Sequence, residues 1–250
     1  MANDNVESKS GKVFVASDEN KAKAKQFRIF AILAFVIAIG FEVLAILQLG
    51  NNPVNMTWLI SFIVVDLVFA ITGSLLWKKS NRLDPASEKN QFKFFVQNQL
   101  GMIIGVIAFL PLVILIFTNK NMSGKQKGIA GSIAAVALVI AGVVGTDFNP
   151  PSVEKYTKEI NEQTEVLKEL NIEDNVFWST AGNKYHIKKD CYHIADRIGV
   201  VNGTVKESWD KKGISELCKT CKAKAEKEQN IDSSNDIEEL EEAAEVLDLL

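Results

Sequence analysis

The chain has 250 residues and a nearly balanced charge, with 28 Lys+Arg against 31 Asp+Glu and a net charge of -3 at pH 7. Because proteins usually bind nucleic acids through a basic face that displaces counterions from phosphates, this balance argues against a DNA or RNA partner. The three cysteines all lie between residues 191 and 221, which favours a metal site over a disulfide framework.

The first half of the chain is predominantly apolar. Residues 1–26 are polar and lack periodicity, which is typical of a disordered N-terminal tail. Four stretches then follow, each long and apolar enough to cross a hydrocarbon core of roughly 30 Å, which takes about 20 helical residues. They are Phe27–Leu49, Met56–Trp77, Asn98–Phe117 and Gly128–Val144. The first is better interpreted as a permanent span than as a signal peptide, because no small-residue cleavage site follows its long apolar core.

Basic residues near the ends of the spans predict their orientation, since Lys and Arg are retained on the cytoplasmic side. Lys21, Lys23, Lys25 and Arg28 precede the first span, and several more basic residues follow the second. We therefore expect a cytoplasmic N-terminus, and four spans then return the C-terminal half to the cytoplasm. The outer loop, however, carries three lysines between residues 120 and 127. If the Gly-rich fourth stretch failed to span, the C-terminal half would lie outside.

The fourth stretch also carries small residues four positions apart, Gly131 with Ala135 and Ala141 with Gly145. This spacing lets two helices approach closely. Packing within the bundle is the favoured interpretation, and contact with a second copy of the chain is the alternative.

Two acidic residues fall inside the predicted spans, Glu42 in the first and Asp66 in the second. Intramembrane carboxylates are costly enough to be functional candidates by default. Counted from the connecting loop, the two lie at similar depth, so they could share a proton or a cation. The favoured alternative is structural: each is protonated or bonded to a group such as the Thr72 or Ser74 hydroxyl, and holds the bundle together.

An amphipathic helix is predicted after the last span. Ser152 follows two prolines and can cap it, and apolar residues then recur every three or four positions from Val153 to Leu170. The helix could be a short coiled-coil stalk for a dimer. It could equally lie on the bundle or on the domain that follows.

The segment from Val176 to Ala225 carries the remaining structural signals. A β-rich run at 176–180, a turn and a returning strand at 185–187 predict a hairpin that presents His186 at its end. Cys191 is expected at the start of a helix, and Asn202-Gly203 at a turn. Thr204 and Glu207 form a predicted capping box for a helix that Gly213 ends.

Four residues in this segment are of the types that bind soft or borderline metal ions: His186, Cys191, Cys218 and Cys221. The last two form a CxxC pair, whose spacing lets both sulfurs reach one ion. Three thiolates and one imidazole close a tetrahedral Zn²⁺ shell with no open position, which is typical of a structural site. His193 is the competing fourth ligand, and His186 is favoured over it.

Together these patterns predict a fold class: an α-helical transmembrane bundle of four spans, followed by an amphipathic helix and a small α+β zinc-binding domain. The predicted boundaries are a disordered tail over 1–26, the bundle over 27–148, a linker helix over 149–173, the zinc-binding domain over 174–229 and an acidic tail over 230–250.

The sequence also resembles known families. The motifs that carry the resemblance are Phe177-Trp178-Ser179-Thr180, Gly182, Tyr185-His186, Asp190-Cys191, Gly203-Thr204-Val205, Gly213 and Cys218-Lys219-Thr220-Cys221. They are similar to a small zinc-binding domain of bacterial proteins, itself similar to the metal-binding module of Ada-type DNA repair proteins. That module implies a zinc site held by four cysteines, one of which accepts a methyl group. Here His186 stands in place of one cysteine, so the methyl-acceptor activity is not implied.

The wider layout is similar to a group of uncharacterised multi-pass membrane proteins of Gram-positive bacteria. Its motifs are Asp84–Asn90, Gln97–Gly101 and Asp147–Pro150. This resemblance implies a location in the cell membrane and brings no activity with it.

Three functions follow from these patterns. The favoured one is a non-catalytic membrane protein whose zinc domain recruits a protein partner, which could be a second copy, or responds to metal or thiol oxidation. The alternative is a small cation- or proton-coupled transporter subunit that uses Glu42 and Asp66. Zinc enzymology is disfavoured, because nothing positions a general base such as Asp190 or Glu207 at an open coordination site.

Overall fold

The computed structural model describes residues 13–230, and these residues form two compact units. The bundle unit comprises residues 15–154. The C-terminal unit comprises residues 155–230 together with residues 13 and 14. The predicted acidic tail, apart from Asn230, lies outside the described residues, as do residues 1–12 of the predicted N-terminal tail.

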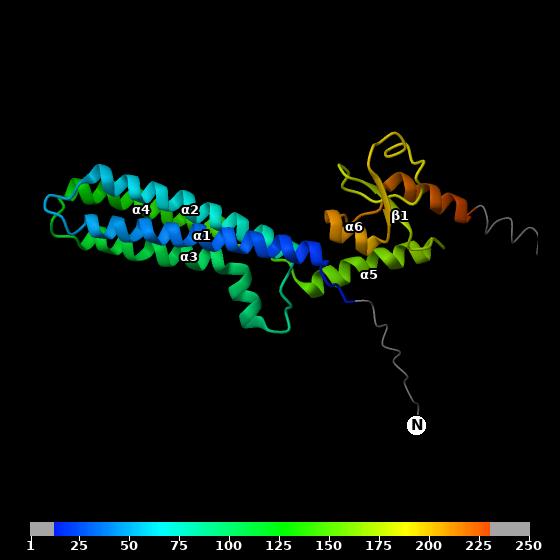
Figure 1. Ribbon diagram of the computed structural model, residues 1–250, viewed down its shortest axis with the longest axis horizontal. Helices are drawn as coiled ribbons and strands as arrows, with labels where there is room; N and C mark the ends of the chain where they lie inside the picture. The colour runs from blue at the N-terminus through cyan, green and yellow to red at the C-terminus, as the bar shows by residue number, and fades with distance from the viewer. Residues whose placement is uncertain (1–12, 231–250) are drawn as a thin grey trace, which may run out of the picture. The chain divides into compact units, whose positions relative to one another are not determined.

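Four long helices build the bundle unit: α1 (Asp18–Gln48), α2 (Met56–Leu83), α3 (Gln91–Thr118) and α4 (Gly124–Gly145). Successive helices run in opposite directions (Figure 1). The α1–α2 and α3–α4 loops meet at one end, where the Asn119 side-chain amide donates to the Leu49 carbonyl at 2.7 Å. All four helices are long and apolar enough to cross a membrane. The prediction of four such helices is therefore confirmed.

The first helix starts earlier than the sequence analysis predicted. Ser17 caps α1, accepting a hydrogen bond from the backbone N–H of Asn20, and the helix begins at Asp18. Residues 18–26 are therefore helical, and their assignment to a disordered tail was wrong. Asp18 and Glu19 in the first turn form ion pairs with Lys21 and Lys23. These pairs, and the acidic residues at the helix N-terminus, stabilise helix in a segment whose polar composition suggested a tail.

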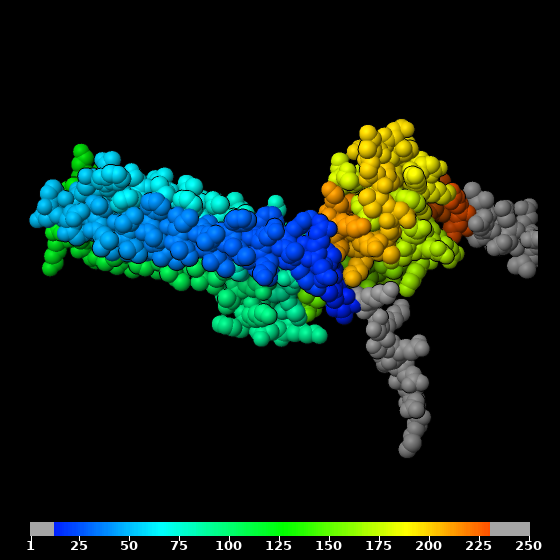
Figure 2. Space-filling model, in the orientation of Figure 1, coloured from blue at the N-terminus to red at the C-terminus, as the bar shows by residue number. Residues whose placement is uncertain are grey.

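Large apolar side chains cover the outside of the bundle. On α1, which runs along the near face in Figure 2, Phe30, Val36 and Leu47 are each more than half exposed. The buried side chains of the same helix are mainly alanines. A helix that is apolar on its exposed side suits lipid rather than water.

The interior of the bundle is closely packed through small residues. A Cβ placed on Gly145 would lie 2.4 Å from the backbone nitrogen of Met102 and 2.5 Å from the carbonyl carbon of Gly101. A Cβ on Gly105 would meet that of Ala141 at 3.0 Å. The small residues of α4 therefore pack against α3 of the same chain, as the favoured interpretation of their spacing predicted.

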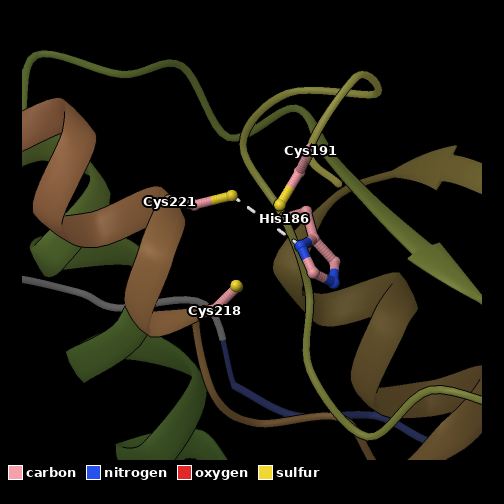
Figure 3. A group of neighbouring side chains, drawn as sticks. All are labelled: His186, Cys191, Cys218 and Cys221. Atoms are coloured by element: carbon pink, nitrogen blue, oxygen red, sulfur yellow. Dashed lines mark hydrogen bonds between the residues drawn. The ribbon is translucent and has the colours of Figure 1, made fainter. Parts of the chain in front are cut away.

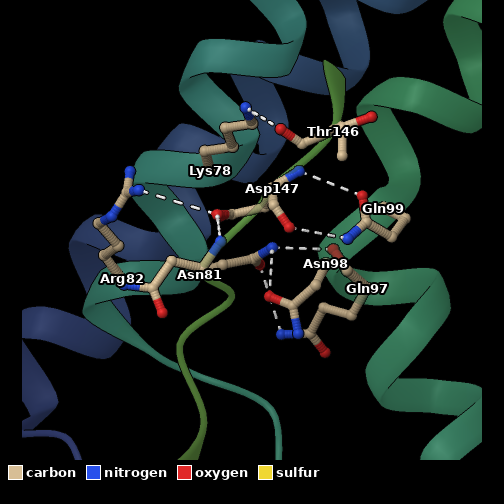
Figure 4. Close-up of polar contacts among 9 residues, drawn as sticks. Lys78, Asn81, Arg82, Gln97, Asn98, Gln99, Thr146 and Asp147 are labelled. Carbon is tan, nitrogen blue, oxygen red and sulfur yellow. Dashed lines mark hydrogen bonds and ion pairs between the residues drawn. The ribbon is translucent and has the colours of Figure 1, made fainter. Parts of the chain in front are cut away.

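A cluster of polar side chains joins α2, α3 and the end of α4 (Figure 4). Gln99 donates to the Asp147 carbonyl at 3.0 Å and accepts from the Asp147 backbone N–H at 3.1 Å. Asn81, which is fully buried, donates to the Gln97 carbonyl at 2.8 Å. Lys78 donates to the Thr146 carbonyl at 2.6 Å. The cluster fastens the end of the bundle from which the chain continues to α5.

From Lys155 onward, the helix α5 (Val153–Glu169) is part of the C-terminal unit rather than a separate linker. Its Leu167 is fully buried in the same apolar core as Val176 and Trp178. Its Gln163 accepts a hydrogen bond from the Tyr185 hydroxyl at 2.9 Å. The predicted boundary at residue 173/174 was therefore wrong, because the apolar stripe of this helix supplies one wall of the domain.

The sheet of the C-terminal unit differs from the predicted hairpin. Strand β1 (Val176–Ser179) pairs antiparallel with β2 (Val200–Gly203), with Val176 opposite Gly203. The predicted returning strand makes only two isolated bridges, His186 with Phe177 and Tyr185 with Leu217. Asn202-Gly203 thus lies in a strand and not in a turn. After β2, helix α6 (Val205–Lys212) starts at the predicted capping box and ends at Gly213, whose φ of 66° is left-handed.

Candidate metal centre

His186 is held by the edge of the sheet. Its backbone N–H donates to the Phe177 carbonyl at 2.7 Å, and its carbonyl accepts from the Phe177 N–H at 2.8 Å. These two bonds fix the backbone on either side of the imidazole. The ring turns Nδ1 toward the cysteines, 3.7 Å from the Cys221 sulfur, while Nε2 points away from them (Figure 3). Nδ1 is therefore the nitrogen available to an ion in this group.

Cys218 and Cys221 sit at the start of a helical segment, residues 219–230. The Cys218 N–H donates to the Tyr185 carbonyl at 2.8 Å, which ties this pair to the segment that carries His186. Burial disfavours the Cys218 thiolate, but the backbone N–H groups of Cys221 and Thr220 point at its sulfur, and the pKa of the thiol is lowered as a result. The local backbone therefore favours the form that binds metal.

Cys191 comes from a loop of turns, not from the start of a helix as predicted. Its carbonyl accepts from the backbone N–H groups of Ile194 and Ala195, both at 2.8 Å. Its own backbone N–H donates to the Lys188 carbonyl at 3.3 Å. These bonds close a tight loop that aims the sulfur at the other ligands (Figure 3).

The four candidate ligand atoms form one compact group. The sulfurs of Cys191, Cys218 and Cys221 and a ring nitrogen of His186 all lie within 4.8 Å of one another. All four residues are buried. A tetrahedral ion bound to thiolates at about 2.3 Å holds its ligand atoms roughly 3.5–4 Å apart. The group needs only a small contraction to close on such an ion, so these residues lie close enough to bind a metal.

Burial sets the protonation of the remaining ligands in the absence of metal. It raises the pKa of the Cys221 thiol to about 12, and the neighbouring sulfurs of Cys191 and Cys218 add to the effect. Burial lowers the pKa of His186, and His193 and Arg197 nearby act in the same direction. The imidazole is thus ready to bind as the neutral base. A cation in the group would reverse the preference of Cys221, because a coordinating thiol is deprotonated.

His193, the competing ligand, lies outside this group. Its ring centroid is 6.2 Å from that of His186. Its Nε2 lies 3.3 Å from the Thr220 hydroxyl, and its side chain is exposed. The structure brings His186, and not His193, together with the three sulfurs.

Shallow cavities adjoin the group on two sides. One, of about 350 Å³, is lined by His186, Cys218 and the basic residues Lys184, Arg197 and Lys219. The other, of about 170 Å³, is lined by Cys191 and Cys221. The ligands are therefore buried but close to solvent. A divalent ion bound to three thiolates would carry a net charge of −1. The basic residues around the first cavity would partly offset that charge.

The intramembrane acids lie where the sequence placed them, on facing helices of the bundle. Asp66 is fully buried and Glu42 is 6% exposed. Their carboxyl groups are close enough to interact electrostatically. The Thr72 and Ser74 hydroxyls, named as hydrogen-bonding partners in the structural interpretation, donate instead to the Val68 and Ala70 carbonyls, both at 2.8 Å.

The sequence analysis missed the polar cluster at the end of the bundle. Its buried members include Asn81, Asn98 and Asp147. The signal was present, because uncharged amides flank the end of the second predicted span and the start of the third, but the sequence analysis did not connect them with one another. No protein-family model, curated protein or solved structure matches this chain.

Proposed function

We propose that this chain is a multi-pass protein of the cell membrane whose C-terminal unit is held together by one structural Zn²⁺ ion and acts as a non-catalytic module on the cytoplasmic side. The observation that carries the proposal is the compact group of His186, Cys191, Cys218 and Cys221. The four apolar helices of the bundle unit support the membrane location.

The ligand types favour zinc. Three thiolates and one imidazole select a borderline or soft ion over Mg²⁺ or Ca²⁺, which prefer oxygen. The same set suits tetrahedral geometry. With all four positions occupied by protein, no site remains for an activated water or a substrate, so the ion would hold the fold and not catalyse a reaction.

The composition of the core supports a structural role. All three ligand cysteines belong to the apolar core of the C-terminal unit, beside Trp178, Tyr185 and Leu217. A domain of this size buries little apolar area, and a bound ion usually supplies the missing stability. Losing the ion would leave unpaired thiols at the centre of that core.

The module could recruit a partner through the loop that Cys191 anchors. This loop exposes two large apolar side chains, Tyr192 at 70% and Ile198 at 97%. Because the Cys191 sulfur is part of the metal group, binding of zinc would fix the base of the loop. Docking of a protein partner would then depend on metal occupancy and on the reduced state of the thiols, which joins recruitment to sensing.

A matched pair of histidine variants tests the metal site. In the full chain purified in detergent, we expect one zinc per chain by elemental mass spectrometry. His186→Ala should lose at least most of that zinc, since it removes one of four ligands. His193→Ala should retain the zinc. It also removes an imidazole, and the centroid of that ring lies only 6.2 Å from the centroid of the His186 ring. Equal zinc content in the two variants would contradict the ligand assignment.

A thiol-labelling experiment tests the orientation. Every cysteine of the chain lies in the proposed site, so a membrane-impermeant thiol reagent reports on that site alone. We expect labelling only in permeabilised cells treated with a strong chelator. Labelling of intact cells would place the C-terminal unit outside and overturn the cytoplasmic orientation.

The second candidate function is a small proton- or cation-coupled transporter subunit. The complete burial of Asp66 next to Glu42 favours it. Flux measured in vesicles containing the purified chain tests it, and a wild-type chain that moves neither protons nor cations would remove it.

A further inference from the structure

The least satisfied polar group in the described part of the chain is the Asp66 carboxyl. Both of its oxygens are buried and have no hydrogen-bond partner among residues 13–230. The residue lies in the apolar core region of α2, between Ile63 and Ala70, which are themselves buried. A carboxylate left alone in such surroundings strongly destabilises the fold, so a ligand or a proton is needed to neutralise it.

Among residues 13–230, no basic side chain forms an ion pair with Asp66. Its charged neighbour in this part of the chain, Glu42 on α1, is itself acidic. The sequence of α3 has no ionisable residue from Gln99 to Thr118, and that of α4 has none from Gly128 to Gly145. The Thr72 and Ser74 hydroxyls, which follow Asp66 on α2, already donate to backbone carbonyls. The group that neutralises Asp66 must therefore come from outside residues 13–230.

The chemistry of the surroundings favours a proton over a metal cation. A hard cation such as Ca²⁺ or Mg²⁺ takes six or more oxygen ligands, and it supplements carboxylates with carbonyls or waters. On α2 the buried residues on either side of Asp66, Ile63 and Ala70, are apolar members of the bundle core and offer no oxygen ligand from their side chains. A proton, by contrast, needs only one oxygen to bind. The Glu42 carboxyl is the nearby group that can share it.

We propose that Asp66 and Glu42 form a proton-binding site inside the bundle. One proton from water binds a carboxylate oxygen of Asp66 and is shared with the Glu42 carboxyl; its release returns it to water, and no other bond changes. The site is independent of zinc. It is also the site that the transporter candidate would require, although a proton can bind and exchange there without net flux.

Infrared spectroscopy of the full chain in lipid vesicles tests this site. Aspartate labelled with ¹³C at the side-chain carboxyl separates the band of protonated aspartic acid from that of glutamic acid. At neutral pH we expect one protonated-aspartic-acid band in the wild type. Asp66→Asn should abolish it, and Glu42→Gln should shift but not remove it. Asp18→Asn, which changes an exposed aspartate, should leave it intact.

Three results would overturn the proposal. The first is a neutral-pH spectrum without the labelled band. The second is a band that disappears when Na⁺ or K⁺ is added at constant pH, because the pair would then bind a cation instead. The third is a band that does not shift in D₂O, because its proton would be locked in and purely structural. All three measurements use only the wild type, so they remain decisive even if Asp66→Asn fails to fold.

Discussion

The bundle unit and the C-terminal unit solve the problem of a weak core in opposite ways. Between lipid-embedded helices the hydrophobic effect gives little driving force, so close backbone approach and interhelical hydrogen bonds must hold them. The bundle accordingly packs glycines and alanines such as Gly101, Ala141 and Gly145 against one another. The C-terminal unit packs large side chains such as Trp178 and Tyr185 beside the cysteines of the metal group.

This difference implies that the two units depend on different features. The bundle depends on the absence of side-chain atoms at its closest contacts and on the polar cluster around Asn81 and Asp147. If the proposed function is correct, the C-terminal unit depends on an ion that would join three segments distant in the sequence. A perturbation of one unit should therefore leave the other largely intact, and perturbations of graded size test that separation.

Loss of the metal should give the largest effect. Structural zinc contributes an apparent 10–16 kcal/mol, roughly as much as the whole stability of an ordinary domain. We expect Cys221→Ser, or treatment with a strong chelator, to abolish the fold of the C-terminal unit. Hydrogen exchange followed by mass spectrometry should show lost protection over residues 155–230 and unchanged protection over α1 to α4.

Thr220→Ser is the matched control for that variant. It changes a neighbouring side chain by one methyl group and keeps all four ligands. We expect it to retain both zinc and protection. If Cys221→Ser instead kept its protection, the ion would be dispensable for the fold. If the bundle also lost protection, the two units would not be independent.

A single methyl group in the bundle should give an intermediate effect. Gly145→Ala would place its Cβ 2.4 Å from the Met102 nitrogen, and the backbone must shift to accommodate it. Overpacking of this kind costs about 1–3 kcal/mol. Gly142→Ala, three residues earlier on α4, has no atom within 4 Å of the new Cβ. It should be neutral, or stabilising by up to about 1 kcal/mol through helix propensity.

Thermal unfolding in detergent, followed by circular dichroism, compares these two variants. We expect a lower midpoint for Gly145→Ala than for the wild type, and no decrease for Gly142→Ala. Zinc content should stay the same in both. Equal midpoints would mean that the α3–α4 contact does not limit the stability of the bundle.

The parts of this structure that the sequence predicted are those that depend on local patterns. The four apolar helices follow from hydropathy over about twenty residues each. The start of α6 follows from Thr204 and Glu207, and its end from Gly213. The ligand set follows from residue types and from the CxxC spacing of Cys218 and Cys221. Each of these signals lies within one short segment.

The errors arose where distant segments meet. Strand β1 pairs with β2 some twenty residues away, and Asn202-Gly203 has the composition of a turn, so local preference pointed to the wrong partner. The stripe on α5 indicated that its Leu167 side was covered, but not by what. The sequence favoured His186 over His193 as the fourth ligand. The choice could be settled only once the pairing of His186 with Phe177 was known.

The smallest expected effect concerns a contact within the bundle unit, between the α2–α3 loop and Glu154, the last residue of that unit. Glu154 accepts from the Ser87 hydroxyl at 2.5 Å and from the Glu88 backbone N–H at 2.8 Å. Although partial burial acts the other way, these bonds lower the pKa of Glu154 below its ordinary value. A depressed carboxyl pKa stabilises the fold above the unfolded-state value and loses that contribution as pH falls through the folded one. Glu154→Gln should therefore cost about 0.5 kcal/mol or less at pH 7, because the side chain is only partly buried and solvent screens its charge. Measured by thermal unfolding, that difference should vanish in acid.

Glu165→Gln, an exposed change on the same helix, is the control and should show no difference from the wild type at either pH. A loss of stability in Glu154→Gln that did not depend on pH would mean that the packing of this side chain, and not its charge, stabilises the contact.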